Sequence, residues 1–258
     1  LLDSEILMSE VLNKDRKNIL LNSNKKLDKK NLILFNNLVY ERAKGKPVAY
    51  IIGKKSFWKY DFHINEGVLI PRPDTELIIE ETLKITKNKI NLNILDIGVG
   101  SGCILLSILK EKESFFGTGI DLSSKSLKNT QINANKLNVN NRIKLFKSNV
   151  DNFNIGKYDL IISNPPYIKK LDLKYLEKDV FNFEPRLALD GGLDGTSKIS
   201  KVIKKSSELI KKNGKLVIEI AFDQKLKVKK MLNDKGFYIN KVMKDLANND
   251  RCIISTKI

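Results

Sequence analysis

The spacing of hydrophobic residues changes near residue 54 of the chain. Residues 1–53 repeat apolar side chains every three or four positions, the period of an α-helix, and Gly45 followed by Pro47 is typical of a helix stop. Residues 54–70 instead alternate with aromatic and β-branched side chains, which is the period of a strand. We therefore expect helices followed by a β-hairpin, whose turn lies at Asn65-Glu66-Gly67.

Strand and helix patterns alternate through the rest of the chain. The segment PRPDTELIIEETL begins it, and Asp74 or Thr75 is the expected N-cap of a helix that runs to about Thr86. The expected elements that follow are strand 92–97, helix 102–111, strand 115–120, helix 123–137, strand 143–148, strand 158–163, helix 197–212, strand 215–220, helix 224–235, and strands near 237–243 and 251–257. This alternation predicts a doubly wound α/β sheet with ligands at the carboxyl ends of its strands.

Composition narrows the class of protein without identifying a partner. The chain has 258 residues, of which 41% are hydrophobic and 30% charged, enough for one large or two modest domains. Its net charge of +17 suits nucleic-acid binding, but an AT-biased coding sequence would also produce many lysines and asparagines. The apolar run at 103–109 is too short for a membrane span, and the first residues resemble an amphipathic helix more than a signal peptide.

Few residues are available for metal or thiol chemistry. Cys103 and Cys252 lie in apolar surroundings without metal-ligand spacing, which predicts buried, reduced thiols. His63 is the single histidine, so a histidine-based triad or zinc site has one candidate residue. We expect a cytoplasmic protein that binds no metal.

A glycine-rich loop follows the first strand of the predicted sheet. The sequence NILDIG runs into Gly98-Val99-Gly100-Ser101-Gly102 and then a helix, so the backbone can turn sharply and approach a ligand. The dinucleotide-binding fingerprint would need glycine in place of Cys103. Asp121 closes the next strand, where it can accept hydrogen bonds from two ribose hydroxyls or serve as a helix N-cap. Loop and carboxylate together favour S-adenosylmethionine over NAD.

The sequence SNPPY directly follows the strand at 158–163. Proline has no N–H and restricts the residue before it, so this segment is stiff and rich in acceptors. The side-chain oxygen of Asn164 and the carbonyl of Pro165 can accept both N–H bonds of a planar NH₂ group and orient it for methyl transfer. Pro166 stiffens the loop, and Tyr167 is expected to pack on the flat substrate group. A carboxylate brings no donors, so its rejection by roughly 10⁴-fold is expected.

Asn-Pro-Pro-Tyr and the upstream glycine loop resemble those of the amino-methyltransferases that modify nucleobases or glutamine. The segments GKPVAYIIGKKSFW (45–58), VLIPRPDTE (68–76), FEPRLALDGGLDG (183–195) and KDLANNDR (244–251) make nearly the whole chain similar to the release factor glutamine methyltransferases of the HemK/PrmC type. The resemblance implies a class I methyltransferase domain at 72–258, a helical substrate-binding domain at 1–53 and a hairpin linker at 54–71. It implies N5-methylation of the glutamine in the Gly-Gly-Gln motif of class I release factors. Separately, we expect the enzyme to be a monomer.

The resemblance also implies roles for individual residues. The donor would be held by the loop from Gly98 to Gly102, by Asp121 and by Asn164, while Asn164 to Tyr167 would hold the glutamine and Arg72 and Thr75 would line the same cleft. Where the family usually has an acid and an aromatic residue beside adenine, this chain has Asn149 and Val150, which predicts a weaker hold on the donor.

Two alternatives use the same features. A DNA or RNA amino-methyltransferase would share the Asn-Pro-Pro-Tyr loop and the positive charge, but the residues between Tyr167 and Ser197 are few for a target-recognition insertion. A non-catalytic RNA-binding protein would have no reason to keep both loops. Nucleic-acid contact is therefore allowed by the sequence but not required.

Overall fold

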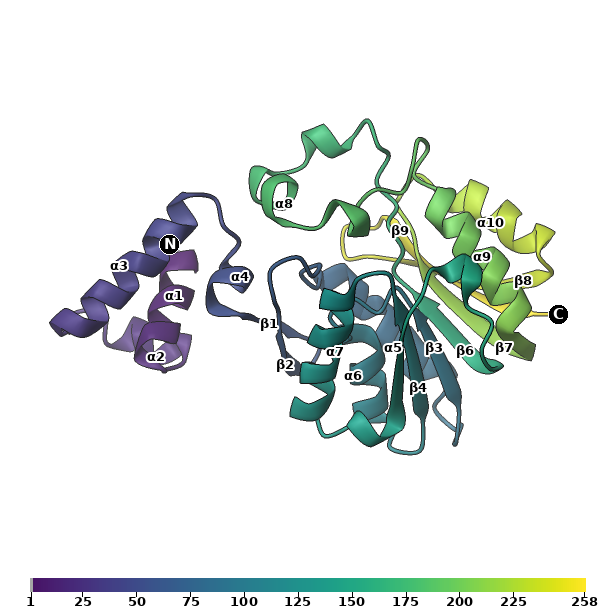
Figure 1. Cartoon of the computed structure of the whole chain (residues 1–258), viewed down its shortest axis with the longest axis horizontal. Coiled ribbons are helices and arrows are strands. Elements are labelled where there is room, and N and C mark those ends of the chain that lie inside the picture. Colours follow the sequence, from purple (N-terminus) through teal and green to yellow (C-terminus); the bar gives the residue numbers. More distant parts are fainter. Residues whose placement is uncertain (1) are drawn as a thin grey trace.

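Helices form the first part of the chain, which the computed structural model describes over residues 2–258. They are α1 (Leu2–Leu12), α2 (Arg16–Leu21), α3 (Lys29–Ala43) and α4 (Val48–Ile52). The side chains of Asp15 and Asp28 cap α2 and α3 by accepting hydrogen bonds from Asn18 N and Asn31 N at 2.7 and 2.8 Å. These helices gather at one end of the molecule, as Figure 1 shows.

A two-stranded hairpin connects the helices to the sheet. Its strands, β1 (Lys54–Phe57) and β2 (Tyr60–His63), pair antiparallel around Trp58 and Lys59, and Trp58 has a positive φ of 57°. The turn predicted at residues 65–67 was therefore wrong. Those residues form a later turn, in which Val68 N donates to Asn65 O at 3.1 Å. A two-residue hairpin turn usually carries glycine or asparagine, so the tryptophan gave no sequence signal for it.

The central sheet has the strand order β5-β4-β3-β6-β7-β9-β8, and only β9 runs antiparallel to its neighbours. The strands are β3 (Asn93–Ile97), β4 (Phe116–Asp121), β5 (Ile143–Lys147), β6 (Tyr158–Ser163), β7 (Ile210–Glu219), β8 (Phe237–Lys244) and β9 (Asp250–Lys257). The order reverses direction between β3 and β6, which places the cofactor crevice of a doubly wound fold at their carboxyl ends.

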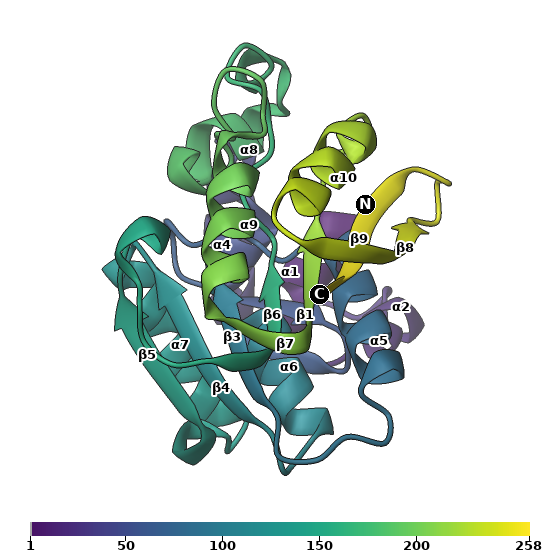
Figure 2. The same cartoon turned by 90° about the vertical axis from the view of Figure 1, so that its right-hand side faces the viewer.

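Helices cover both faces of this sheet (Figures 1 and 2). One face carries α5 (Glu76–Ile85), α6 (Cys103–Glu111) and α7 (Ser124–Lys136), and the other carries α9 (Ser197–Leu209) and α10 (Lys225–Asp234). Neighbouring residues of β3 show the division, since Ile94 belongs to the core on the first face and Leu95 to the core on the second. The doubly wound α/β fold expected from the sequence is confirmed.

Shorter elements fill the connections. They are η1 (Pro73–Thr75), η2 (Asn140–Arg142), η3 (Val150–Asn152), η4 (Leu173–Tyr175), α8 (Lys178–Phe183) and η5 (Arg186–Ala188). Every helix within residues 2–258 is too short or too polar to cross a lipid bilayer.

Thr75 is the N-cap of α5, as expected, although its side chain makes no capping hydrogen bond. Another expected boundary differs from the structure. The helix expected at 197–212 ends at Leu209, and β7 begins at Ile210 instead of residue 215. Asn213 in this strand has a positive φ of 61°, and the pairing of β7 with β6 shifts register near this end.

Candidate active site

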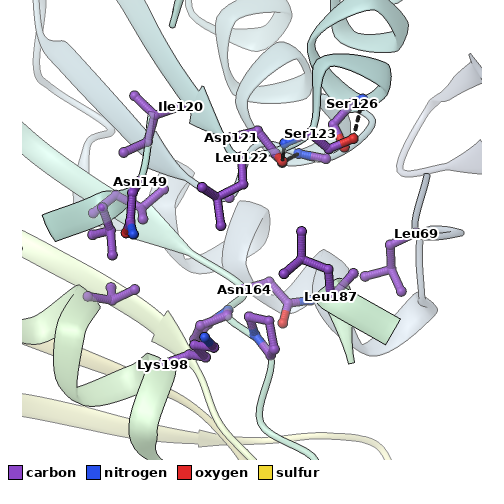
Figure 3. A pocket seen from close by; sticks show the side chains of 18 of the residues that line it. Leu69, Ile120, Asp121, Leu122, Ser123, Ser126, Asn149, Asn164, Leu187 and Lys198 are labelled. Carbon is purple, nitrogen blue, oxygen red and sulfur yellow. Dashed lines mark hydrogen bonds between the residues drawn. The ribbon is translucent and has the colours of Figure 1, made fainter. Parts of the chain in front are cut away.

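A cavity of about 230 Å³ opens at the carboxyl ends of β3, β4 and β6. Eight of the predicted site residues line it, namely Gly98, Gly100, Asp121, Asn149, Val150, Asn164, Pro165 and Pro166. The close-up in Figure 3 shows Asp121 and Asn149 on one side of the cavity and Asn164 on the other. The structure thus brings the expected donor loop and the Asn-Pro-Pro segment to one cavity.

The glycine loop has a backbone that only glycine adopts readily. Gly98, Gly100 and Gly102 all have positive φ, at 81°, 57° and 81°. A Cβ added at Gly102 would lie 2.7 Å from Leu106 Cδ1 and 2.8 Å from Thr130 Cγ2, so the start of α6 could not pack as it does. The glycines therefore set the path of the loop as well as its distance from a ligand.

Asp121 connects the glycine loop with the start of α7. Its carboxylate accepts hydrogen bonds from Gly100 N at 3.0 Å and from Ser123 N at 2.8 Å. The N-cap of α7 is Ser123, whose side chain accepts from Ser126 N, so Asp121 itself is not the cap. Burial raises the pKa of Asp121, while these backbone donors oppose the rise.

Two side chains of α7 donate hydrogen bonds to carbonyl groups of the glycine loop. Thr130 Oγ1 donates to Gly100 O at 3.0 Å, and Asn133 Nδ2 donates to Ser101 O at 2.9 Å. The same Asn133 accepts from the backbone N of His63 at 2.7 Å. One buried asparagine therefore connects the donor loop with the hairpin. The sequence reasoning missed this residue, although polar residues on the inward face of a helix were a signal.

Asp96 is a second acid that the sequence reasoning passed over. It lies in β3 just before the loop, is 1% exposed, and neither of its oxygens has a hydrogen-bond partner within residues 2–258. Burial, and next the charge of Asp121, raise its pKa to about 8. Asp121 beside the loop disfavours a pyrophosphate and suits a cationic ligand, which is the charge of S-adenosylmethionine, whereas the raised pKa keeps Asp96 largely protonated at neutral pH.

Asn149 and Val150 lie on the wall expected for adenine. Asn149 begins η3, and its Oδ1 accepts from Asp151 N at 3.2 Å. An amide oxygen has two lone pairs, so one remains for an adenine amino group. Val150 contributes an aliphatic surface to the same wall.

The Asn-Pro-Pro-Tyr segment is fixed by partners from distant parts of the chain. Asn164 Nδ2 donates to Thr75 Oγ1 at 3.0 Å, which leaves Oδ1 without a partner among the described residues. The Tyr167 hydroxyl donates to Glu219 Oε1 at 3.0 Å, and Gln224 Nε2 donates to Tyr167 O at 3.0 Å. Tyr167 packs against the core instead of lining the cavity, so its stacking on a substrate stays a prediction.

Arg72 also lies outside the cavity, where it joins two loops. Its Nη2 is 2.5 Å from Glu184 Oε1, and its Nη1 donates to Ile70 O at 2.9 Å. Glu184 is 5% exposed and also accepts from Ile70 N at 3.2 Å. This pair connects the PRPDT segment to the FEPR segment, and the sequence reasoning missed Glu184.

The chain is similar to known methyltransferases along its whole length. Residues 1–53 match the family model of the PrmC N-terminal domain, and residues 74–193 match that of the methyltransferase small domain. The chain is 35% identical over 257 residues to a release factor glutamine methyltransferase of Caulobacter vibrioides, with 99% of this chain and 89% of that protein covered. With the corresponding protein of Buchnera aphidicola subsp. Schizaphis graminum it shares 39% identity over 256 residues, with 99% and 92% covered.

The chain belongs to the release factor glutamine methyltransferase family. The family resemblance expected from the sequence is therefore confirmed. Among solved structures, a methyltransferase from Pyrococcus furiosus matches with a TM-score of 0.59 and 18% identity over 85% of this chain and 95% of that one. A ribosomal protein L11 methylase from Lactobacillus delbrueckii subsp. bulgaricus matches with a TM-score of 0.54 and 20% identity over 75% and 82%. At these identities the likeness shows the methyltransferase fold alone.

Proposed function

We propose that this chain transfers a methyl group from S-adenosylmethionine to the side-chain amide nitrogen, N5, of the glutamine in the Gly-Gly-Gln motif of class I release factors. The observation that carries the proposal is the orientation of Asn164. Its NH₂ group is engaged by Thr75 at 3.0 Å, so its oxygen is the atom available to a ligand in the cavity. An exposed acceptor at this place fits a substrate that brings N–H groups.

The residues around the cavity fit the donor. The donor supplies an electrophilic methyl group on a cationic sulfur. Gly98 and Gly100 allow it to approach the backbone, Asp121 has lone pairs left for ribose hydroxyls, and Asn149 and Val150 form the wall for adenine. Val99 and Ser101 belong to the same loop but are buried, so their contribution is to its shape.

Asn164 and Pro165 would hold the glutamine amide without a general base. Asn164 Oδ1 accepts one N–H and the Pro165 carbonyl accepts the other, which orients the nitrogen lone pair and favours pyramidal geometry as the new bond forms. Alignment of this kind contributes up to roughly 7–11 kcal/mol in the best intramolecular reactions. The nitrogen becomes strongly acidic once methylated, so water can take the proton that is lost. Pro166 keeps the segment stiff.

The helical end of the molecule offers a surface for the protein substrate. Exposed apolar side chains lie on α3, among them Ile33 at 61% and Tyr40 at 63% exposure. The end of α3 approaches α8, where Arg42 Nη2 lies 4.0 Å from Asp179 Oδ2. A release-factor loop that reaches the cavity would pass residues of both regions. We expect the enzyme to act as a monomer in the cytoplasm, with residues 1–53 as the substrate-binding domain.

Mass spectrometry of a recombinant release factor tests the proposal. Incubation with this protein and S-adenosylmethionine should add 14 Da, one methyl in roughly stoichiometric amount, on the glutamine of Gly-Gly-Gln, and a release factor with Gln→Glu there should gain none. Bulk RNA and DNA are included in parallel. Methylation of nucleic acid without methylation of the release factor would contradict the proposal.

Asn164→Ala tests the role of the acceptor. Methyl transfer should fall by roughly 10²-fold or more, because one of the two contacts that align the amide is lost. Donor affinity measured by calorimetry should stay within about threefold of the unmodified protein. Turnover near that of the unmodified protein would show that Asn164 does not hold the amide.

A further inference from the structure

The first two turns of α9 contribute part of the wall of the donor cavity. Lys198, Lys201 and Val202 of this helix all line the cavity. Lys198 and Val202 are four positions apart, so they lie on the same face of the helix. Figure 3 shows Lys198 across the cavity from Asp121 and Asn149. A ligand that fills the cavity therefore lies between Lys198 and the two side chains expected to hold ribose and adenine.

Contacts with η3 and the residues after it set the position of α9. Lys201 forms an ion pair with Asp151 of η3. One turn further along α9, Lys205 Nζ donates to Asn154 Oδ1 at 2.7 Å. Both contacts join α9 to the segment that begins at the adenine wall. The start of α9 is thereby fixed at the adenine end of the cavity.

Lys198 differs from the neighbouring lysines of α9 because its ammonium group has no partner. Lys201 and Lys205 are both engaged by acceptors, whereas the side chain of Lys198 makes no ion pair or hydrogen bond within residues 2–258. Lys198 is half-buried at the cavity. The stem of a lysine covers apolar surface well, but its ammonium group keeps three N–H donors that need acceptors. These donors are available to a ligand in the cavity.

The covalent structure of the donor decides which of its acceptors meets Lys198. Ribose separates adenine from the methionine tail, so a side chain at the adenine end does not meet the carboxylate of that tail. The acceptors of adenine are its ring nitrogens N1, N3 and N7. N3 lies beside the bond to ribose, whereas N1 lies on the far side of the ring, next to the amino group assigned to Asn149. N1 is therefore the acceptor for a side chain that lies across the cavity from Asp121.

We propose that Lys198 is a further donor-binding residue, which donates a charge-assisted hydrogen bond to N1 of adenine while Asn149 accepts from the adenine amino group. The inference rests on the donor of the proposed function and is independent of its protein substrate. Val150 and Val202 supply apolar surface to the same end of the cavity. The contact from α9 adds to the hold on adenine where Val150 stands in place of an aromatic residue.

Calorimetry with S-adenosylhomocysteine tests the contact, because this ligand lacks the reactive methyl group and binds without turnover. Its 1-deaza analogue has C–H in place of N1 and accepts no hydrogen bond there. The analogue should bind the unmodified protein about 10- to 100-fold more weakly than S-adenosylhomocysteine. Lys198→Met keeps an unbranched side chain and removes the ammonium group. S-adenosylhomocysteine should bind this variant about 10- to 100-fold more weakly, and the two ligands should then bind equally within about twofold.

Two controls separate the contact from general effects of charge and of the ring. Lys204→Met removes an exposed lysine of the same helix that does not line the cavity, and it should bind both ligands as the unmodified protein does, within about twofold. The 3-deaza analogue changes the nitrogen beside ribose, so its loss of affinity should be the same in the unmodified protein and in Lys198→Met. A ¹⁵N label at N1 gives a readout other than affinity, since the chemical shift of this nitrogen should differ between the complexes of these two proteins.

The two proposals fail in different ways. If Lys198→Met binds S-adenosylhomocysteine as tightly as the unmodified protein, or if the loss of N1 costs the same affinity in both proteins, Lys198 does not contact N1. Methylation of the release factor would then leave the proposed function standing. Coupling between Lys198 and N1 without methylation of the release factor would support the contact and contradict the proposed protein substrate. No binding of S-adenosylhomocysteine to the unmodified protein would overturn the contact and the donor together.

Discussion

Two carboxylates lie on either side of the glycine loop and differ in how their oxygens are used. Asp121 accepts from two backbone N–H groups and lines the cavity, whereas Asp96 is 1% exposed and has no partner among the described residues. Asp121 therefore combines a structural role, ordering the loop at Gly100, with the proposed contact to ribose. A substitution at this position loses both.

Replacement of Asp121 by alanine should weaken donor binding by about 10- to 100-fold, because a bidentate acceptor for ribose is lost and Gly100 N loses its partner. Calorimetry with S-adenosylmethionine measures the affinity. Ser123→Ala is the comparison, since it removes only the N-cap of α7 and should change affinity by less than about threefold. Equal affinities for Asp121→Ala and the unmodified protein would mean that Asp121 serves the loop alone.

At the scale of elements, α7 connects parts that the sequence keeps far apart. Asn129 and Asn133 are fully buried, and both donate to the carbonyl of His63 in the hairpin, at 2.8 and 3.0 Å. Asn133 also donates to Ser101 O in the donor loop. The side chain of Asn133 therefore contacts both the hairpin and the donor loop. A change of conformation in either of them should alter the other.

Asn133→Ala should lower the free energy of unfolding by about 2–3 kcal/mol, because it leaves His63 N and Ser101 O buried with fewer partners. Donor affinity should fall as well, by roughly tenfold, since the loop loses a support. Gln131→Ala is the matched control on the exposed side of the same helix and should change stability by less than about 0.5 kcal/mol. Urea titration and calorimetry measure the two quantities; a pure loss of stability with unchanged affinity would show that the loop does not depend on Asn133.

The elements that the sequence predicted well are those with a long periodic pattern. The sheet strands and the helices α6, α7, α9 and α10 were all expected within a few residues of their observed bounds, because burial on one or two faces imposes a period. The hairpin turn was missed because Trp58 is held by long-range contacts, its N by Glu76 at 2.8 Å and its Nε1 by Glu111 at 3.1 Å. Tertiary contacts there replace the usual turn residues.

The residues of the site also divide into those predicted from local motifs and those that only tertiary contacts reveal. The glycine loop, Asp121 and Asn164 were predicted because their motifs are local, and the structure brings them to one cavity. Glu219 was given no role in the site, since its partner Tyr167 lies more than fifty residues away along the chain. Spacing along a sequence contains no information on such contacts without the fold.

At the scale of the whole molecule, positive charge is the dominant surface property. The net charge of +17 is spread along exposed helices, and several lysines are paired with acids, such as Lys201 with Asp151 and Lys227 with Asp194. A protein of this charge attracts an acidic partner at distances of about 10 Å at 0.1 M salt. We expect kcat/KM for the release factor to fall several-fold between about 0.05 and 0.5 M salt, with kcat unchanged. Rates insensitive to ionic strength would mean that the charge has no part in association.

The stability of the molecule should depend on pH through two buried acids, Glu219 and Asp96. The pKa of Glu219 rises from 4.5 to about 7 on folding, so between these values the folded protein binds a proton that the unfolded chain has released. Stability from this group is therefore greatest below pH 4.5 and falls as pH rises to about 7, by roughly 3 kcal/mol in all. Asp96, whose pKa is raised to about 8, contributes in the same direction.

Glu219→Gln should consequently make the protein more stable at neutral pH. The difference in the free energy of unfolding between the variant and the unmodified protein should grow by roughly 2–3 kcal/mol from pH 5 to pH 8, because the substitution removes one buried ionisation. All other titrating groups contribute equally to both proteins and cancel in this difference. Urea titrations followed by Trp58 fluorescence and circular dichroism at both pH values measure this difference. Parallel stability curves would mean that Glu219 has the same pKa in the folded and the unfolded protein, so that burial does not raise it.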